Sequence, residues 1–187
     1  MESWTTHASR TAYENRWIRV REDDVTRPDG SDGVYGVVEV RQPAVFVVAL
    51  TDDDEVVLVE LTRYALGTVS LEVPAGGTDG EDPLEAARRE LAEETGLVAD
   101  TLQPIGHMFA LNGVCHAPEH VFLARGLRPV DGADGADGAD GRTEEGITAV
   151  RRVPWSEVVA LVADGTITDG ETVAALMYAA IALGKVA

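Results

Sequence analysis

Apolar and polar residues follow one another along this chain in short patterns that predict both strands and helices. Runs of β-branched residues bounded by Gly, Pro and Asp are typical of strands. We expect strands at residues 17–25, 33–40, 44–50, 55–60, 71–73, 102–111, 120–124 and 147–154. The run at 44–50 is apolar throughout, which indicates a buried strand.

Apolar residues three and four positions apart predict helices in other parts of the chain. Leu84, Ala87 and Leu91 form one such stripe, and the Ala- and Leu-rich segments 156–164 and 171–183 form others. Strands interspersed with helices in this way are typical of a layered α/β domain.

The helix that carries Leu84 has well-marked ends. Asp82 can cap its N-terminus, Pro83 suits the first helical position, and Glu85 stands where a capping box places its acid. Gly96 is a typical C-terminal stop. We therefore expect a helix between Asp82 and Gly96.

Three glutamates crowd onto about one turn near the end of this helix. At about 100° per residue, Glu90, Glu93 and Glu94 fall within an arc of roughly 100° beside the apolar stripe. Like charges at this spacing repel, and oxygen-rich clusters suit hard cations such as Mg²⁺ or Mn²⁺. Arg89 lies four residues from both Glu85 and Glu93 and can pair with them. Glu90 and Glu94 are then free to bind a shared ion.

A solvated acidic face explains the glutamates alone equally well, but the flanking residues resemble the Nudix box of a family of hydrolases. That box reads Gly, five residues, Glu, seven residues, then Arg-Glu-aliphatic-x-Glu-Glu-x-Gly-aliphatic. Glu81 and residues 89–97, RELAEETGL, match it in order and spacing. Chance gives this match about once in 10⁸ sites. Only four residues separate Gly76 from Glu81, so Ala75 takes the glycine position in strict register, and we interpret this as a deletion in a pliable glycine-rich loop.

The resemblance implies an α/β/α sandwich with a mixed β-sheet and the hydrolysis of a nucleoside diphosphate linked to another group. Divalent ions, Mg²⁺ or Mn²⁺, would neutralise the diphosphate and position water. By the same resemblance, Glu90 and Glu94 are metal ligands, and Glu93 is a ligand or an outer-shell partner. The carbonyl of Ala75 would complete the metal site. Arg89 would support catalysis by holding its neighbouring glutamates.

The attacking water also needs a base. In the similar enzymes a glutamate just before a late strand is the usual candidate. Glu145, two residues before Ile147, occupies that place, and Glu144 is the reserve. The alternative is that both are surface acids beside a loop.

Segments outside the box look like the ADP-ribose and nucleotide-sugar pyrophosphatases: residues 15–17, 28–30, 62–64 and 71–76. This branch implies a small N-terminal β subdomain at 1–41, used in dimerisation, followed by a Nudix domain at 42–187. Arg63 would contact the diphosphate through its planar fork, and Glu72 would bind a ribose or hold Arg63. Trp17 or Tyr13 would stack on a nucleobase across the dimer, and a core or interface anchor is the alternative for Trp17. Ordinary paired strand residues are the alternative for Arg63 and Glu72.

The position about fifteen residues past the box is informative about the substrate. ADP-ribose enzymes typically carry a Pro-Gly pair there, whereas this chain has Asn112 and Gly113. We therefore assign Asn112 to the substrate-binding region and leave open another nucleoside diphosphate sugar or alcohol.

Composition limits the class of protein. With 187 residues, 45% of them hydrophobic, we expect one compact domain with a modest appendage. A formal net charge of −18 argues against a nucleic-acid partner, because binding to phosphate backbones depends on Lys and Arg. Cys115 is the only cysteine, the N-terminal residues lack the apolar core of a signal peptide, and no apolar run has membrane-spanning length. We expect a cytoplasmic protein without a membrane partner.

Residues 131–141 repeat Asp-Gly-Ala, a composition that cannot build a core. We interpret this segment as a flexible spacer. A calcium loop is the less favoured alternative, because a three-residue period matches neither an EF-hand nor a nonapeptide repeat.

Two other functions stay open from sequence alone. The removal of damaged nucleoside triphosphates is one, although the N-terminal strands and residues 71–76 count against it. A ligand-sensing regulator on the same fold is the other, and the intact carboxylates of the box count against that.

Overall fold

The computed structural model describes residues 3–130 and 146–186. The chain forms two compact units: Met1–Pro43 with Met108–Glu119, and Ala44–His107 with His120–Ala187. The first is called the N-terminal unit below, and the second the main unit.

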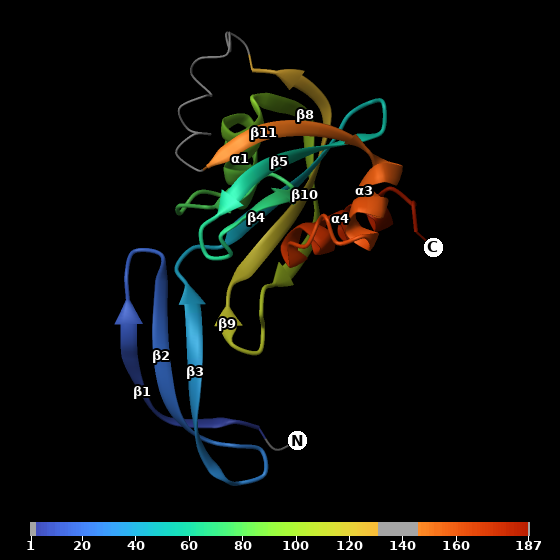
Figure 1. Ribbon diagram of the computed structural model, residues 1–187. Coiled ribbons are helices and arrows are strands. Elements are labelled where there is room, and N and C mark those ends of the chain that lie inside the picture. The colour runs from blue at the N-terminus through green and yellow to red at the C-terminus, as the bar shows by residue number, and fades with distance from the viewer. Residues whose placement is uncertain (1–2, 131–145, 187) are drawn as a thin grey trace. The chain divides into compact units, whose positions relative to one another are not determined.

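The N-terminal unit is built around a four-stranded sheet, drawn mostly in blue in Figure 1. Its strands, in spatial order, are β1 (Thr5–Glu14), β2 (Ile18–Thr26), β3 (Asp32–Val40) and β9 (Cys115–His116). The first three pair antiparallel, and β9 joins β3 in parallel. The turn at 27–31 closes because Gly30 adopts a left-handed φ of 83°, and because Asp29 accepts a hydrogen bond from the Ser31 amide.

Strand β1 was not expected from the sequence. Its ten residues are all exposed, so no alternation of apolar and polar side chains marks it as a strand. Its position is defined by backbone pairing with β2 instead. The two-residue strand β9 also went unpredicted.

The main unit contains a sheet of seven strands. Five form the path β11 (Ile147–Pro154), β5 (Glu55–Arg63), β4 (Ala44–Leu50), β10 (Pro118–Pro129) and β8 (Leu97–Phe109). Two short strands lie off this path: β6 (Thr68–Glu72) pairs with β5, and β7 (Ala75–Gly77) pairs with β4. Pro74, which has no N–H to donate, separates β6 from β7 where a single strand at 71–73 was expected.

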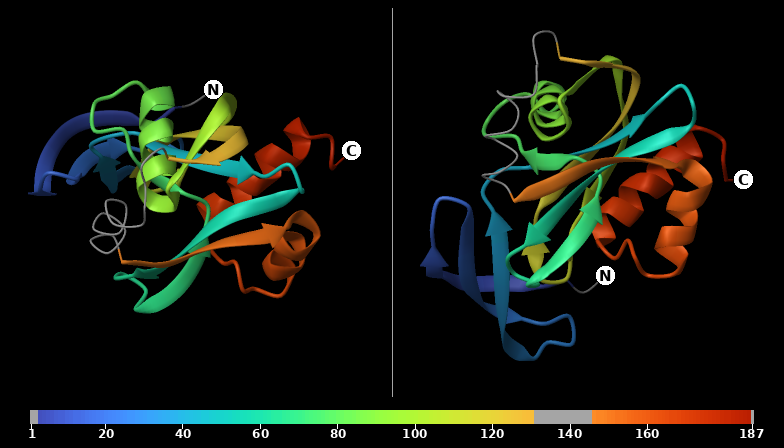
Figure 2. Two further views of the ribbon diagram at one scale, coloured as in Figure 1. Left: turned by 90° about the horizontal axis from the view of Figure 1, so that it is seen from above. Right: turned by 45° about the horizontal axis from the view of Figure 1, so that its top comes forward.

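Helices cover both faces of this sheet (Figure 2). They are α1 (Pro83–Thr95), α3 (Trp155–Ala163) and α4 (Gly170–Ala182). Val45, Val47 and Ala49 of β4 share a buried cluster with Ala87 and Leu91 of α1. The intervening residues of β4 face the other way, where α4 contacts the strand. The expected α/β/α sandwich is therefore confirmed, and both faces of β4 are covered.

Most predicted elements are present, but some ends differ by up to five residues, as in β10, which was predicted at 120–124. Strands β4 and β11 have the predicted bounds, and each helix lies within about one residue of its prediction. Strand β5 continues to Arg63, and β8 begins earlier than expected, at Leu97. None of the helices in the part of the chain that the structure describes is long and apolar enough to cross a membrane.

Candidate active site

Helix α1 begins and ends as its sequence predicts. The Asp82 carboxylate accepts a hydrogen bond of 2.9 Å from the Leu84 amide, and Pro83 occupies the first turn. At the other end Gly96 adopts a left-handed φ of 71°, and its N–H donates to the carbonyl of Ala92. These caps define where the helix begins and ends.

Two of the three clustered glutamates are buried. Glu90 is 4% exposed and Glu94 is 3% exposed, close to the apolar stripe that packs on the sheet. The Glu93 side chain is 53% exposed. Since a buried carboxylate is costly without compensating partners, the contacts of Glu90 and Glu94 decide what this site can do.

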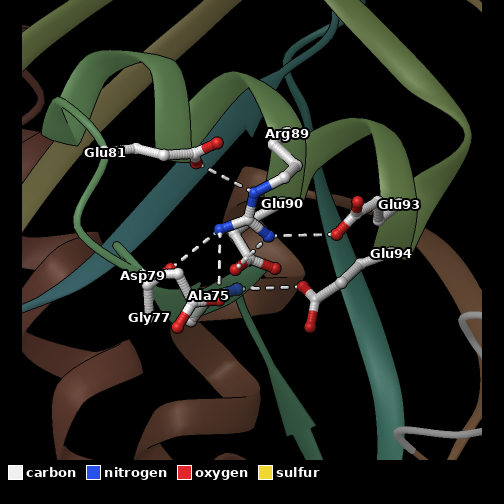
Figure 3. A network of polar contacts seen from close by, with 8 residues as sticks. All are labelled: Ala75, Gly77, Asp79, Glu81, Arg89, Glu90, Glu93 and Glu94. Atoms are coloured by element: carbon white, nitrogen blue, oxygen red, sulfur yellow. Dashed lines mark hydrogen bonds and ion pairs between the residues drawn. The ribbon is translucent and has the colours of Figure 1, made fainter. Parts of the chain in front are cut away.

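Arg89 lies at the centre of a network of polar contacts (Figure 3). Its guanidinium donates to Glu81 at 3.0 Å, to Glu90 at 2.8 Å and to Glu93 at 3.0 Å. It also donates to the Gly77 carbonyl at 2.9 Å. Burial acts to lower the pKa of Arg89, but the hydrogen bonds and charges of these glutamates outweigh burial and raise it.

This network corrects two expectations. Arg89 does not pair with Glu85, which lies 3.7 Å from Arg88 instead. Glu90 is not left free, because the Arg89 side chain turns toward it as well as toward Glu93. The spacing of residues along the helix cannot predict which glutamates Arg89 contacts. Its side chain is long enough to reach residues beyond those four positions away.

Strand β7 brings backbone groups up to the buried carboxylates. The Ala75 N–H donates to Glu94 at 2.9 Å. A Cβ at Gly76 would overlap the Glu90 carboxylate, so a larger residue there requires that side chain to shift. Ala75, Gly76 and Gly77 pair with β4 in regular register, so the short loop before Glu81 leaves this strand intact.

A divalent cation fits the chemistry of this arrangement. Glu90 and Glu94 are two buried carboxylates beside a backbone segment that carries further oxygen atoms, and hard ions prefer such donors. Among residues 3–130 and 146–186, no three Asp, Glu, His or Cys side chains are grouped so as to hold a metal ion. The groups that could hold a cation here are Glu90 and Glu94, with a backbone oxygen such as the Ala75 carbonyl.

Arg63 and Glu72 form an ion pair between neighbouring strands β5 and β6. The Arg63 Nε donates to both Glu72 oxygens, at 2.9 and 3.2 Å, and Nη2 donates to the same carboxylate. Glu72 is buried, whereas about half of the Arg63 side chain is exposed. The hydrogen bond to Glu72 raises the pKa of Arg63 against the opposing effect of burial, and the charges of Asp169 and Glu94 add to it. Two roles were expected for Glu72, binding a ribose or holding Arg63. The structure contains the contact with Arg63.

The other expected site residues belong to the N-terminal unit or to the part of the chain that the structure does not describe. Trp17 and Asn112 belong to the N-terminal unit and are exposed, and the Arg16 guanidinium lies 3.9 Å from the Trp17 ring centre. Glu144 and Glu145 lie outside the described residues, as does the repeat at 131–141.

Thr172 of α4 makes a contact that was not predicted from the sequence. Its hydroxyl accepts a hydrogen bond of 3.2 Å from the Val73 amide, 99 positions away in the chain. The sequence predicts only that a helix covers residues 171–183. Nothing in that pattern indicates which distant strand the helix start contacts.

Comparison with known proteins shows where the chain has relatives. Residues 4–38 match the family model described as the nucleoside diphosphate sugar hydrolase N-terminal domain, and residues 40–176 match the NUDIX domain. The chain is 30% identical over 174 residues to an ADP-ribose pyrophosphatase of Bacillus subtilis (strain 168), covering 92% of this chain and 90% of that one. It is also 30% identical over 168 residues to a methanol dehydrogenase activator of Bacillus methanolicus, covering 89% and 86%.

A solved structure shows the same fold. The crystal structure of an ADP compounds hydrolase superposes with a TM-score of 0.82 at 23% sequence identity, covering 99% of this chain and 96% of that one. The family model spans most of the chain and includes the helix with its glutamates and the strands around it. This chain belongs to the NUDIX family.

Proposed function

We propose that this protein hydrolyses the pyrophosphate bond of a nucleoside diphosphate linked to a second group, most favourably ADP-ribose or a nucleotide sugar. The products would be a nucleoside monophosphate and a sugar phosphate. Family membership and a relative named ADP-ribose pyrophosphatase support this reaction. The single observation that carries it is the pair of buried carboxylates, Glu90 and Glu94, against the backbone of β7.

Each group near α1 has a distinct role in this proposal. A bound Mg²⁺ or Mn²⁺ supplies charge neutralisation of the diphosphate and a more acidic water. Glu90 and Glu94 hold the cation, and the Ala75 N–H keeps the Glu94 carboxylate oriented. Arg89 holds Glu90 and Glu93 in position and supplies positive charge among acidic groups.

Arg63 is the group that we assign to the diphosphate. Its side chain is about half exposed, and the buried Glu72 carboxylate orients its guanidinium through Nε and Nη2. A planar fork held in this way suits phosphate oxygens. Because the chain carries a formal charge of −18, an anionic substrate depends on such local cations.

Glu145 remains our candidate for the base that deprotonates water, with Glu144 as the reserve. Its place in the chain, two residues before Ile147 at the start of β11, supports the assignment. Glu145→Gln is expected to lower kcat far more than it changes KM, and an unchanged kcat would remove Glu145 from the mechanism.

For the assembly we propose a homodimer formed through the N-terminal subdomain at 1–41, with the Nudix domain at 42–187. Every residue of β1 is exposed, and β1 is the outer strand of its sheet, with a row of backbone groups suited to pairing. Light scattering after gel filtration will measure the mass. With a single cysteine the chain can form no intrachain disulfide, which supports a cytoplasmic location.

A panel of substrates tests the reaction. The protein is incubated with Mg²⁺ and separate nucleotide sugars, dinucleotides and triphosphates, and the products are identified by chromatography. Release of a nucleoside monophosphate with a sugar phosphate is the expected result. Pyrophosphate released from a triphosphate would instead show the house-cleaning activity, and no product from any compound would favour a ligand sensor.

A further inference from the structure

Three consecutive residues, the two that link β6 to β7 and the first residue of β7, are each held by a different element of the main unit. The Val73 N–H donates to Thr172 Oγ1 of α4 at 3.2 Å. The Pro74 carbonyl accepts from the Val47 amide of β4 at 2.8 Å, and the Ala75 N–H donates to Glu94 of α1 at 2.9 Å. The backbone that enters the site is thus positioned from three sides.

The contact with α4 is fully removed from water. Thr172 is 0% exposed and Val73 is 1% exposed. A buried amide needs a partner, and without the Thr172 hydroxyl this amide has no solvent to replace it. Without that hydroxyl, residues 73–75 are expected to shift until the Val73 N–H finds another acceptor.

The hydroxyl is itself held in place. Thr172 lies in the first turn of α4, where its own N–H donates to the capping carboxylate of Asp169 at 2.7 Å. A β-branched side chain at such a position has few rotamers. The start of α4 therefore presents a fixed acceptor to Val73.

We propose that Thr172 is a positioning residue for the cation site: it fixes residues 73–75 so that the Ala75 backbone and the Glu94 carboxylate stay aligned for the ion. In this role Thr172 acts through Val73 and Ala75. The inference rests on the proposed function in one respect only, that a divalent cation binds beside Glu94.

Binding of Mn²⁺ to the protein without substrate tests this directly, with electron paramagnetic resonance reporting free Mn²⁺. Thr172→Val keeps the shape of the side chain and removes the acceptor. Loss of contacts that orient metal ligands weakens metal binding about 10- to 100-fold, so we expect the Kd for Mn²⁺ to rise at least about tenfold. Thr172→Ser, which keeps the oxygen, is expected to restore the Kd to within about threefold of the wild type.

Ala175→Gly is the matched control for a general loss of stability. Ala175 is 0% exposed in the same helix, and glycine there weakens α4 without removing the hydrogen bond to Val73. We expect this variant to lower the Tm and to leave the Kd for Mn²⁺ unchanged. A wild-type Kd in Thr172→Val, or an equal rise in Ala175→Gly, would overturn the inference. Should Thr172→Val not fold, Thr172→Ala removes the same oxygen and is judged in the same way.

The substrate panel separates this inference from the proposed function. A wild-type protein that binds Mn²⁺ and hydrolyses nothing would end the proposed reaction, while the Thr172 variants would still decide the positioning role. A wild-type protein that binds no Mn²⁺ would overturn both.

Discussion

The side chains of Glu90 and Glu94 are buried. Burying an isolated carboxylate costs free energy of folding. Their partners offset that cost: Arg89 donates to Glu90, and the Ala75 amide donates to Glu94. The two side chains are therefore ordered before any ion arrives. In the proposed cation site, ordered ligands would lose less conformational entropy on binding, which favours tight binding.

Replacement of either carboxylate by its amide tests this site at the level of single residues. Glu90→Gln and Glu94→Gln are each expected to lower kcat/KM by at least about 100-fold, more than the loss of an indirect partner costs. Steady-state kinetics with Mg²⁺ will measure the effect. Glu85→Gln is the control, because Glu85 lies on the same helix and is 65% exposed beside Arg88. Normal hydrolysis and Mn²⁺ binding in both site variants would contradict the proposed function.

Gly76 offers a second test, because its neighbour provides a matched control. Gly76→Ala places a methyl on the Glu90 carboxylate, whereas the nearest atom to a Cβ at Gly77 lies 3.7 Å away. We expect Gly76→Ala to displace Glu90 and to cost about 1–3 kcal/mol of stability, the usual range for overpacking. Urea unfolding and Mn²⁺ binding will measure both effects. Equal behaviour of Gly76→Ala and Gly77→Ala would refute the close approach.

Among the elements, the cross-strand charges of the N-terminal unit show how a polar strand is held in register. Arg19 of β2 lies opposite Glu39 of β3, and their side chains form an ion pair. Arg21 adds a second contact to Glu39 at 2.9 Å. Such pairs contribute little energy individually, but they disfavour a slipped register because slippage would separate the opposite charges.

The pH dependence of stability tests the pair on β2 and β3. The hydrogen bond from Arg19 lowers the pKa of Glu39 below its ordinary value of 4.5, against a smaller effect of burial. A lowered pKa means that the stabilisation is present above the unfolded pKa and is lost as pH falls through the folded one. Glu39→Gln is therefore expected to be less stable than the wild type at pH 7, by no more than about 1 kcal/mol. The difference should vanish in acid.

Urea unfolding at a series of pH values, followed by tryptophan fluorescence, will measure this difference. Two of the three tryptophans, Trp4 and Trp17, report on the N-terminal unit. A difference between the two proteins that stays constant from neutral pH to strong acid would rule out the Arg19 contact as its cause.

The whole molecule carries 33 acidic and 15 Lys or Arg side chains, a formal net charge of −18. This field attracts divalent cations generally and repels anionic substrates. Specific binding therefore has to be distinguished from a diffuse ion atmosphere. The buried pair of carboxylates makes that distinction measurable, because diffuse attraction changes little when one charge is removed.

Thermal unfolding with and without Mn²⁺ is the corresponding test. An ion that binds only the folded state adds about 2.7 kcal/mol of stability at a concentration 100 times its Kd, so calorimetry should show a clear rise in Tm. Glu94→Gln changes the formal charge by one unit only, and we expect it to abolish most of the rise. A variant that is stabilised as strongly as the wild type would assign the effect to the ion atmosphere.

Local sequence patterns were enough to predict most elements and the box helix. The caps at Asp82 and Gly96 depend on neighbouring backbone atoms, and the buried strand β4 shows a continuous apolar run. Strand β1 escaped prediction because it has no buried face to leave a periodic pattern. The Arg89 contacts were only partly anticipated, since the guanidinium also meets the Gly77 carbonyl, a contact from outside the helix that helix spacing does not reveal.

By itself the sequence determined the family, the helix with its three glutamates and the expectation of a cation, because these follow from spacing along one helix. Only the tertiary structure decided which carboxylates are buried, that Glu72 holds Arg63, and that Thr172 supports the backbone beside Glu94. The physical reason is the separation along the chain between the residues that interact. Spacing along a helix is set by local backbone geometry, whereas burial and distant hydrogen bonds exist only once strands and helices far apart in the chain have packed together.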